Sequence, residues 1–287
     1  MIQKRTKGQK IFNVFNIFFL TLGCAIFIIP YWIVIASSFT DEITLISNGY
    51  NLFPKKFSIY AYEFLFEKDL PLVQSFVNTI YVVVSSTFLT TLTCTLYAYA
   101  LQHRALKGRK FFNIYMVFTM LFSGGLIPTY LVVTSFFEDS LWSLVIPGMM
   151  ACYYTLLIRN YFVSLPSSFA EAAELDGATD FTILFKIYIP LSVPVLVTIA
   201  MFCVVFQWNN YTGPMLYIES KEKYTIQLML QKLLDNVGNM IPSSSSIIPT
   251  ESLKMAAIVV TTVPIICVYP FIQKFFINGM IIGGVKE

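Results

Sequence analysis

Long apolar stretches divide the chain into predicted helices. Ionisable residues almost vanish inside them, and a helix needs about 20 mostly apolar residues to cross a hydrocarbon core. Six stretches reach that length, at approximately residues 14–38, 75–101, 111–134, 141–163, 188–211 and 253–276. The pattern predicts an all-α integral membrane protein with six transmembrane helices, forming a single membrane domain over residues 1–287.

The basic residues between these stretches predict the orientation, because cytoplasmic flanks carry an excess of Lys and Arg. Twelve Lys and Arg residues lie before the first stretch, in the two alternate loops on the same side and after the sixth stretch, against seven on the other side. Both termini are therefore expected in the cytoplasm. Two longer loops, at about 39–74 and 212–252, are expected outside.

The composition supports lipid as the surrounding medium. The chain is 56% hydrophobic and 12% charged, with a mean hydropathy of +0.70, whereas soluble domains carry about 25% charged residues. Its net charge of +3 is too small and too scattered to indicate a nucleic-acid partner. The five cysteines lie inside apolar runs without paired spacing, which indicates neither a disulfide framework nor a zinc site.

One predicted cytoplasmic loop, residues 164–190, departs from this pattern because it keeps four acids: Glu171, Glu174, Asp176 and Asp180. Ser168 and Glu171 have the spacing of a capping box, and Gly177 suits a left-handed helix end. A second helix is expected to begin at Thr179 or Asp180. Since a helix of about eight residues is marginal in water, the first one should pack either on the chain's own inner surface or on a cytoplasmic partner.

The stretch EAAELDGATDFTILFKIYIP, Glu171 to Pro190, resembles the EAA loop of binding-protein-dependent ABC importer permeases. That pattern is EAA, three residues, Gly, nine residues and I-x-L-P, and six residues fall in register: Glu171, Ala172, Ala173, Gly177, Ile187 and Pro190. Ile189 replaces the leucine. The stretches FSGGLIPTYLVV, FQWNNYTGPMLYI and VYPFIQKFFINGMIIGGVKE are similar to the carbohydrate-uptake branch, and to the Gram-positive oligosaccharide subunit that pairs with a second permease.

The resemblance implies roles for particular residues. In that family the EAA loop is a coupling helix seated in a cleft of an ATPase subunit, which implies this role for Glu171, Ala172, Ala173, Asp176 and Gly177. Two roles remain open for Glu171, the helix cap and the contact with the ATPase. Related permeases direct a similar tail toward the ATPase, which implies contacts from Gly283 and Gly284.

The resemblance also implies an assembly in the bacterial cytoplasmic membrane. The implied partners are a second homologous permease, two ATPase subunits, an extracellular solute-binding protein, a carbohydrate substrate and the lipid bilayer. No cofactor is expected in this chain, because ATP and Mg would be bound by the partner ATPase.

A path for a neutral sugar should offer uncharged hydrogen-bonding groups and aromatic faces. Such groups gather about 25–32 Å along the fifth stretch from Pro190, at 1.5 Å per residue, toward its outer end. The candidate substrate-path residues are Gln207, Trp208, Asn209, Asn210 and Tyr211, with Asn78 of the second stretch. The alternative is structural, because aromatic residues concentrate at membrane interfaces and asparagine caps helices.

The chain shows no energy source of its own. It lacks a G-x-x-x-x-G-K-[ST] loop, the stretches keep no ionisable residue near their centres, and no HExxH or G-x-S-x-G pattern is present. The sole histidine, His103, is interpreted as a solvated loop residue. We therefore expect a non-enzymatic permease subunit that forms half of an ATP-driven path, the alternative being an ATPase-independent secondary carrier or channel.

Overall fold

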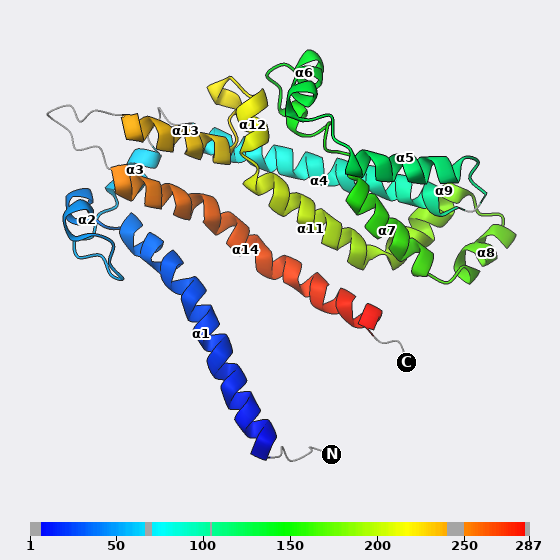
Figure 1. The fold of residues 1–287 in the computed structure, drawn as a ribbon, viewed down its shortest axis with the longest axis horizontal. Helices are drawn as coiled ribbons and strands as arrows, with labels where there is room; N and C mark the ends of the chain where they lie inside the picture. The colour runs from blue at the N-terminus through cyan, green and yellow to red at the C-terminus, as the bar shows by residue number, and fades with distance from the viewer. Residues whose placement is uncertain (1–6, 67–70, 104, 240–249, 285–287) are drawn as a thin grey trace. The chain divides into compact units, whose positions relative to one another are not determined.

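The structure is a computed structural model that describes residues 7–66, 71–103, 105–239 and 250–284 (Figure 1). Every labelled element in it is a helix, and one isolated antiparallel bridge joins Thr40 and Phe57. The chain divides into two compact units. The first consists of residues 1–70 and 233–262, and the second of residues 71–232 and 263–287.

The first unit contains α1 (Lys7–Ser38), α2 (Glu42–Asn48), α3 (Tyr60–Leu65) and the start of α14 (Thr250–Gly284). Aromatic stacking holds the segment after α1 together, because the ring of Phe39 lies 5.6 Å from Phe57 and 4.9 Å from Tyr62 between centroids. The segment is thus a folded element.

A buried carboxylate joins α2 to the start of α14. Glu42 is only 6% exposed and accepts four hydrogen bonds of 2.7–2.9 Å, from the Thr250 hydroxyl, the Glu251 amide, and the amide and hydroxyl of Ser252. The first amides of a helix have no partner within it and carry partial positive charge. Glu42 therefore caps α14 from a different helix.

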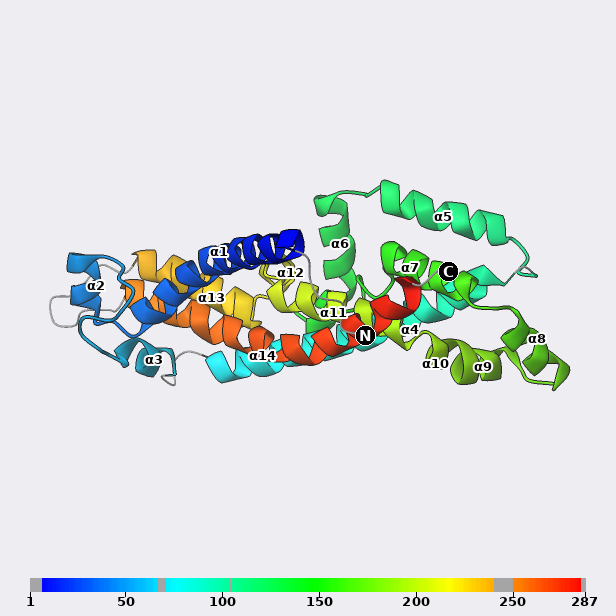
Figure 2. The same ribbon diagram turned by 90° about the horizontal axis from the view of Figure 1, so that it is seen from below.

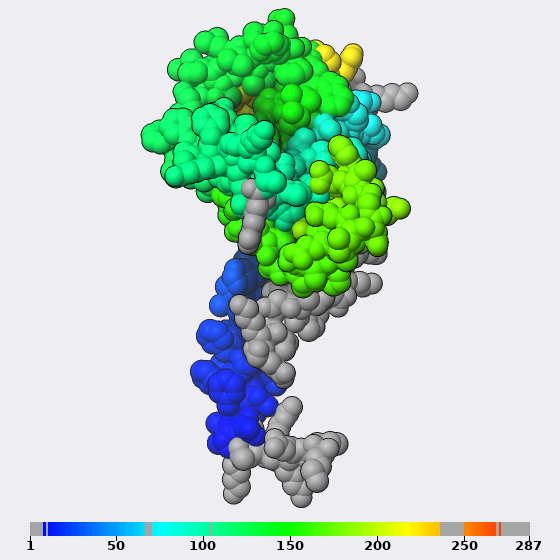
Figure 3. All heavy atoms as spheres, turned by 90° about the vertical axis from the view of Figure 1, so that its right-hand side faces the viewer, coloured from blue at the N-terminus to red at the C-terminus, as the bar shows by residue number. Residues whose placement is uncertain are grey.

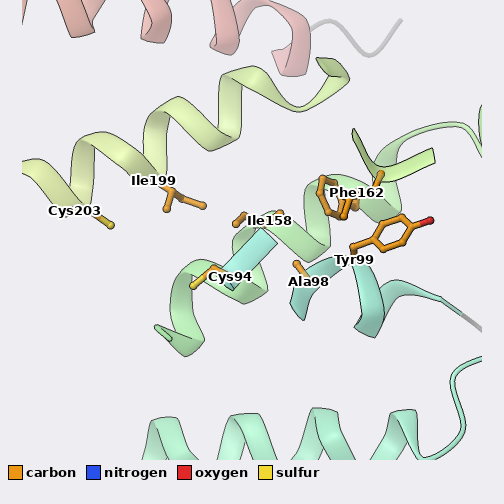
Figure 4. Packing of buried hydrophobic residues seen from close by; sticks show 8 residues of the cluster. Cys94, Ala98, Tyr99, Ile158, Phe162, Ile199 and Cys203 are labelled. Atoms are coloured by element: carbon orange, nitrogen blue, oxygen red, sulfur yellow. The ribbon is translucent and has the colours of Figure 1, made fainter. Parts of the chain in front are cut away.

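The second unit is built around three helices, α4 (Leu72–Gln102), α7 (Cys152–Ser164) and α11 (Val193–Asn209). In Figure 4 Cys94, Ala98 and Tyr99 of α4 point toward Ile158 and Phe162 of α7 and Ile199 and Cys203 of α11. Cys94, Ala98, Ile158 and Ile199 are completely buried. The small side chains of Cys94 and Ala98 let the helix backbones approach closely.

Shorter elements surround this core. They are α5 (Arg109–Leu121), α6 (Leu126–Phe136), the 3₁₀ turns η1 (Leu141–Leu144) and η3 (Lys221–Lys223), α8 (Ser168–Leu175), α9 (Asp180–Ile183), the π-helical turn η2 (Leu184–Tyr188), α10 (Ile189–Leu191) and α12 (Thr212–Tyr217). The helix α13 (Ile226–Asn239) begins in this unit and ends in the first.

Within the described residues, three helices are long and apolar enough to cross a membrane: Ile11–Ser38, Leu72–Gln102 and Thr250–Cys267. Two bent pairs raise the number to five if each is one span, namely Arg109–Leu121 with Leu126–Phe136, bent by 110°, and Asp180–Leu191 with Val193–Asn209, bent by 80°. Figure 2 shows the sharp turn between α5 and α6. The prediction of six continuous spans is therefore not confirmed, although the all-helical membrane class is.

The fourth predicted stretch, 141–163, is not one helix. It consists of η1 and α7, separated by residues 145–151, which include Pro147 and Gly148. Proline lacks the amide that a continuing helix needs. Side chains of α4 donate to backbone carbonyls of this segment: Thr90 to Gly148, Thr93 to Met149, and Cys94 to Ala151, whose carbonyl also accepts from the Thr155 amide.

Candidate functional site

The helix α8 lies at the surface of the second unit, where Figure 3 shows α8 and α9 in yellow-green facing the viewer. All eight of its residues are described, and none has a buried side chain. Leu175 at its end is 90% exposed. Leu175 was not selected from the sequence, although a leucine between two acids, Glu174 and Asp176, is a signal that could have found it.

The predicted capping box is wrong. The N-cap residue is Ser167, one position earlier than expected, and its side chain makes no capping hydrogen bond within the described loop. The amide of Glu171 donates instead to the backbone carbonyl of Ser167 at 3.0 Å. A competing backbone bond of this kind satisfies the amide that a serine hydroxyl would have served. No capping hydrogen bond therefore engages Glu171 in the described loop.

The end of α8 forms as predicted at Gly177, whose φ is +77°. The amide of Ala178 donates to the Ala173 carbonyl at 2.9 Å, and that of Gly177 to the Glu174 carbonyl at 3.0 Å. This pair of bonds is a Schellman motif, which requires a left-handed residue at the position of Gly177. The predicted N-cap of the next helix is also confirmed, since the Thr179 side chain accepts from the Thr182 amide.

A cavity of about 430 Å³ lies between α8 and the ends of α4 and α7. Its lining includes acids and bases together, namely Glu171 and Glu174 of α8 with His103 and Arg109. His103 is partly solvated, as predicted, with 39% of its side chain exposed, but it also has a partner that was not predicted, because its Nε2 lies 3.4 Å from Asp180 Oδ1. The two residues are brought together by the turn at Gly177, which sequence spacing alone did not reveal.

The remaining predicted coupling residues are exposed or half-buried. Ala172, Asp176 and Gly177 are exposed, and Ala173 is half-buried. The predicted tail residues, Gly283 and Gly284, form the last described residues of α14.

The predicted substrate-path residues separate into two groups. Four of them bind the protein's own scaffold or are buried: Asn78, Gln207, Trp208 and Asn210. Asn78 donates to the carbonyls of Glu222 and Tyr224 at 2.7 and 3.0 Å. Gln207 donates to the Ser86 hydroxyl at 3.1 Å, Asn210 accepts from the Gly213 amide at 3.1 Å, and Trp208 is 8% exposed.

The other two predicted residues, Asn209 and Tyr211, are exposed. The side-chain amide of Asn209 donates to the Val205 carbonyl of its own helix at 2.8 Å. Tyr211 is 49% exposed. Of the predicted set, these two side chains offer polar groups to a molecule outside the unit.

A second polar cluster, near η3, was not selected from the sequence. Asp139 has a left-handed backbone, with φ of 42°, and its carboxylate binds the ammonium of Lys223, the hydroxyl of Ser220 and the amides of Glu219 and Ser220. The hydrogen bonds from Lys223 and then Ser220 hold the pKa of Asp139 well below its ordinary range. The cluster therefore depends on an ionised carboxylate.

Acid is expected to weaken this cluster. A depressed pKa contributes stability that is complete above the unfolded-state value, about 3.9, and is lost as the pH falls from there through the much lower folded-state value. Asp139→Asn should therefore lower the unfolding temperature at about pH 7, and the gap to the wild type should narrow as the pH falls below about 4. Thermal unfolding in detergent across this range measures the effect, with the exposed neighbour Glu138→Gln as control. A gap that stays constant with pH would contradict it.

Comparisons with known proteins place this geometry among transport proteins. A family model described as "Binding-protein-dependent transport system inner membrane component" matches residues 98–282. The "Polygalacturonan/rhamnogalacturonan transport system permease protein YtcP" of Bacillus subtilis is 38% identical over 284 residues, covering 97% of this chain and 99% of the relative. "Protein LplC" of the same organism is 37% identical over 292 residues, covering 98% and 97%.

A solved structure is similar over most of its length. It is described as the "Crystal structure of a bacterial ABC transporter involved in the import of the acidic polysaccharide alginate". The TM-score is 0.82 at 30% sequence identity, and the match covers 95% of this chain and 99% of the other.

Proposed function

Because the chain belongs to the family of binding-protein-dependent transport system inner membrane components, we propose that it forms half of a carbohydrate path and couples it to an ATPase through α8. The chain is a permease subunit of an ABC importer in the cytoplasmic membrane, and it carries no ATPase of its own. Such a system also includes an ATPase, a binding protein and a partner permease.

The observation that carries the coupling role is the exposure of α8. A short helix without a buried side chain gains little from its own unit and is marginal by itself, so it fits a surface that another subunit covers. Leu175 offers an apolar group, Glu171 and Asp176 offer charges, and Ala172 permits close approach. We assign these residues, with Ala173 and Gly177, to the ATPase contact, and place Gly283 and Gly284 in the same contact.

The substrate is proposed to be an oligosaccharide. Relatives are named for transport of polygalacturonan and rhamnogalacturonan and of arabinooligosaccharides, and these names support a carbohydrate here. In this chain Asn209 and Tyr211 supply the matching chemistry, an amide and an aromatic hydroxyl that are exposed. We place both termini in the cytoplasm and the coupling loop, residues 164–190, on the same side.

Reconstitution tests this function directly. The chain, its partner permease and ATPase are placed in proteoliposomes, and the binding protein delivers labelled oligosaccharide. Uptake is expected to require ATP on the ATPase side, since ATP must favour one conformation over the other to drive the change. Uptake by this chain alone under an ion gradient would contradict the proposal and favour a secondary carrier.

The path residues give a separate prediction. The double variant Asn209→Ala/Tyr211→Ala should reduce uptake by about tenfold, the effect of losing roughly one or two hydrogen bonds to the substrate, without changing the unfolding temperature. Asn78→Ala is the matched contrast, because it removes two hydrogen bonds from a buried side chain to the carbonyls of Glu222 and Tyr224 and should lower the unfolding temperature. Normal uptake by the double variant would remove both residues from the path.

A further inference from the structure

A short column of side chains connects the end of α4 to the start of α9. His103 Nε2 lies 3.4 Å from Asp180 Oδ1, and the His103 ring stands edge-on to Tyr99 with centroids 5.9 Å apart. Tyr99 meets Tyr188 of η2 at 5.3 Å, and Tyr188 meets Phe162 of α7 at 5.2 Å. We call these five residues the loop joint. It links the segment that follows α8 to two helices of the core.

Residues of the loop joint line parts of two cavities. The cavity of about 430 Å³ includes Tyr99, His103 and Tyr188 in its lining, and a second cavity of about 620 Å³ includes Tyr99, His103 and Asp180. The loop meets α4 through the loop joint and through the buried Leu184, which belongs to the same core cluster as Ala98 and Tyr99.

The two residues of the pair lie at helix ends that suit them. His103 follows the last turn of α4, where unpaired carbonyls would favour its protonated form, and Asp180 opens α9, where unpaired amides favour an anion. Their side chains are 39% and 71% exposed, so solvent screens the pair. An exposed ion pair changes a conformational equilibrium by at most about fivefold. This is too little to determine the fold, but it is enough to favour one orientation of a loop.

We propose that His103 is a positioning residue for coupling. Its contact with Asp180 fixes the direction of α9, and with it α8, relative to α4, so that movement of α8 is passed to the core helices. This inference rests on the proposed function, because it takes α8 as the helix that the ATPase moves. It gives the sole histidine of the chain a role in the transport cycle without contact to substrate or nucleotide.

The first test uses the assembled transporter in proteoliposomes. His103→Ala is expected to raise the ATP hydrolysed per sugar imported by about threefold, while the ATPase still co-purifies. Asp180→Ala should act in the same direction, and the double variant should be no worse than His103→Ala, because both single variants remove the contact between His103 and Asp180. Lys107→Ala, which removes an exposed cation of the same loop, is the control. A normal ratio in His103→Ala, or additive effects in the double variant, would overturn the proposal.

The second test needs no ATPase. Hydrogen–deuterium exchange of residues 178–184 in the purified chain should be about threefold faster in His103→Ala and unchanged in Lys107→Ala. Equal exchange in wild type and His103→Ala would overturn the inference, as would faster exchange with a normal ratio of ATP to sugar. If the ATPase fails to co-purify with the wild-type chain, the proposed function fails instead, which separates the two claims.

Discussion

Gly177→Val is expected to reduce ATP-driven uptake by at least about tenfold while the chain still inserts into the membrane. The left-handed backbone at φ of +77° costs a residue with a side chain about 1–2 kcal/mol, most of all a β-branched one. That cost falls on an eight-residue helix with no buried side chain, so the Schellman end should be lost and α8 should fray. Uptake and transport-linked ATP hydrolysis in proteoliposomes measure the effect.

Two further variants separate backbone strain from other effects at Gly177. Asparagine tolerates the left-handed region better than other residues with side chains, so Gly177→Asn should retain most activity. Gly124→Ala is the matched control, because a Cβ there meets no atom within 4 Å and the backbone is not left-handed. Equal activity of Gly177→Val and Gly124→Ala would show that the turn at Gly177 is dispensable for coupling.

Glu42→Ala is expected to lower the free energy of unfolding of the first unit by about 3 kcal/mol. The substitution removes an acceptor of four hydrogen bonds, and buried donors left without partners are costly. Thermal unfolding of the purified chain in detergent measures the loss. Glu42→Gln should fall between Glu42→Ala and the wild type, since the amide keeps one acceptor oxygen.

The control for Glu42 is Glu63→Ala, which removes an exposed acid of α3 in the same unit. Its unfolding temperature should stay near that of the wild type, because isolated surface charges contribute little. If Glu42→Ala unfolds at the same temperature as Glu63→Ala, the carboxylate does not stabilise α14. Unchanged stability of Glu42→Gln would show that charge is unnecessary for this cap.

The apolar stretches predicted the fold class, but they did not predict where the helices bend or break. Hydropathy measures how well a segment suits lipid, and it is insensitive to a bend or break that neighbouring helices accommodate. The bend of 110° after α5 is marked by Gly124 and Gly125, and the break before α7 by Pro147 and Gly148. These residues were visible in the sequence, yet the length of the apolar run took precedence in the prediction.

At the candidate site, rules for local backbone structure succeeded where one residue type decides the geometry. Gly177 closes α8 and Thr179 opens α9 as predicted. The capping box at Ser168 failed because α8 begins one residue earlier and the Glu171 amide is bound by the backbone carbonyl of Ser167. Contacts between distant segments, such as His103 with Asp180 and Asp139 with Lys223, were missed because sequence spacing does not show which loops meet.

The break between η1 and α7 leaves backbone carbonyls inside an apolar stretch, and hydroxyl and thiol groups of α4 take them up. A backbone carbonyl without a hydrogen-bond partner is costly in hydrocarbon. The hydroxyls of Thr90 and Thr93 supply the hydrogen bonds that water would supply in a soluble protein. The threonine-rich face of α4 thus lets a broken helix lie in an apolar stretch with hydrogen-bond partners from within the protein.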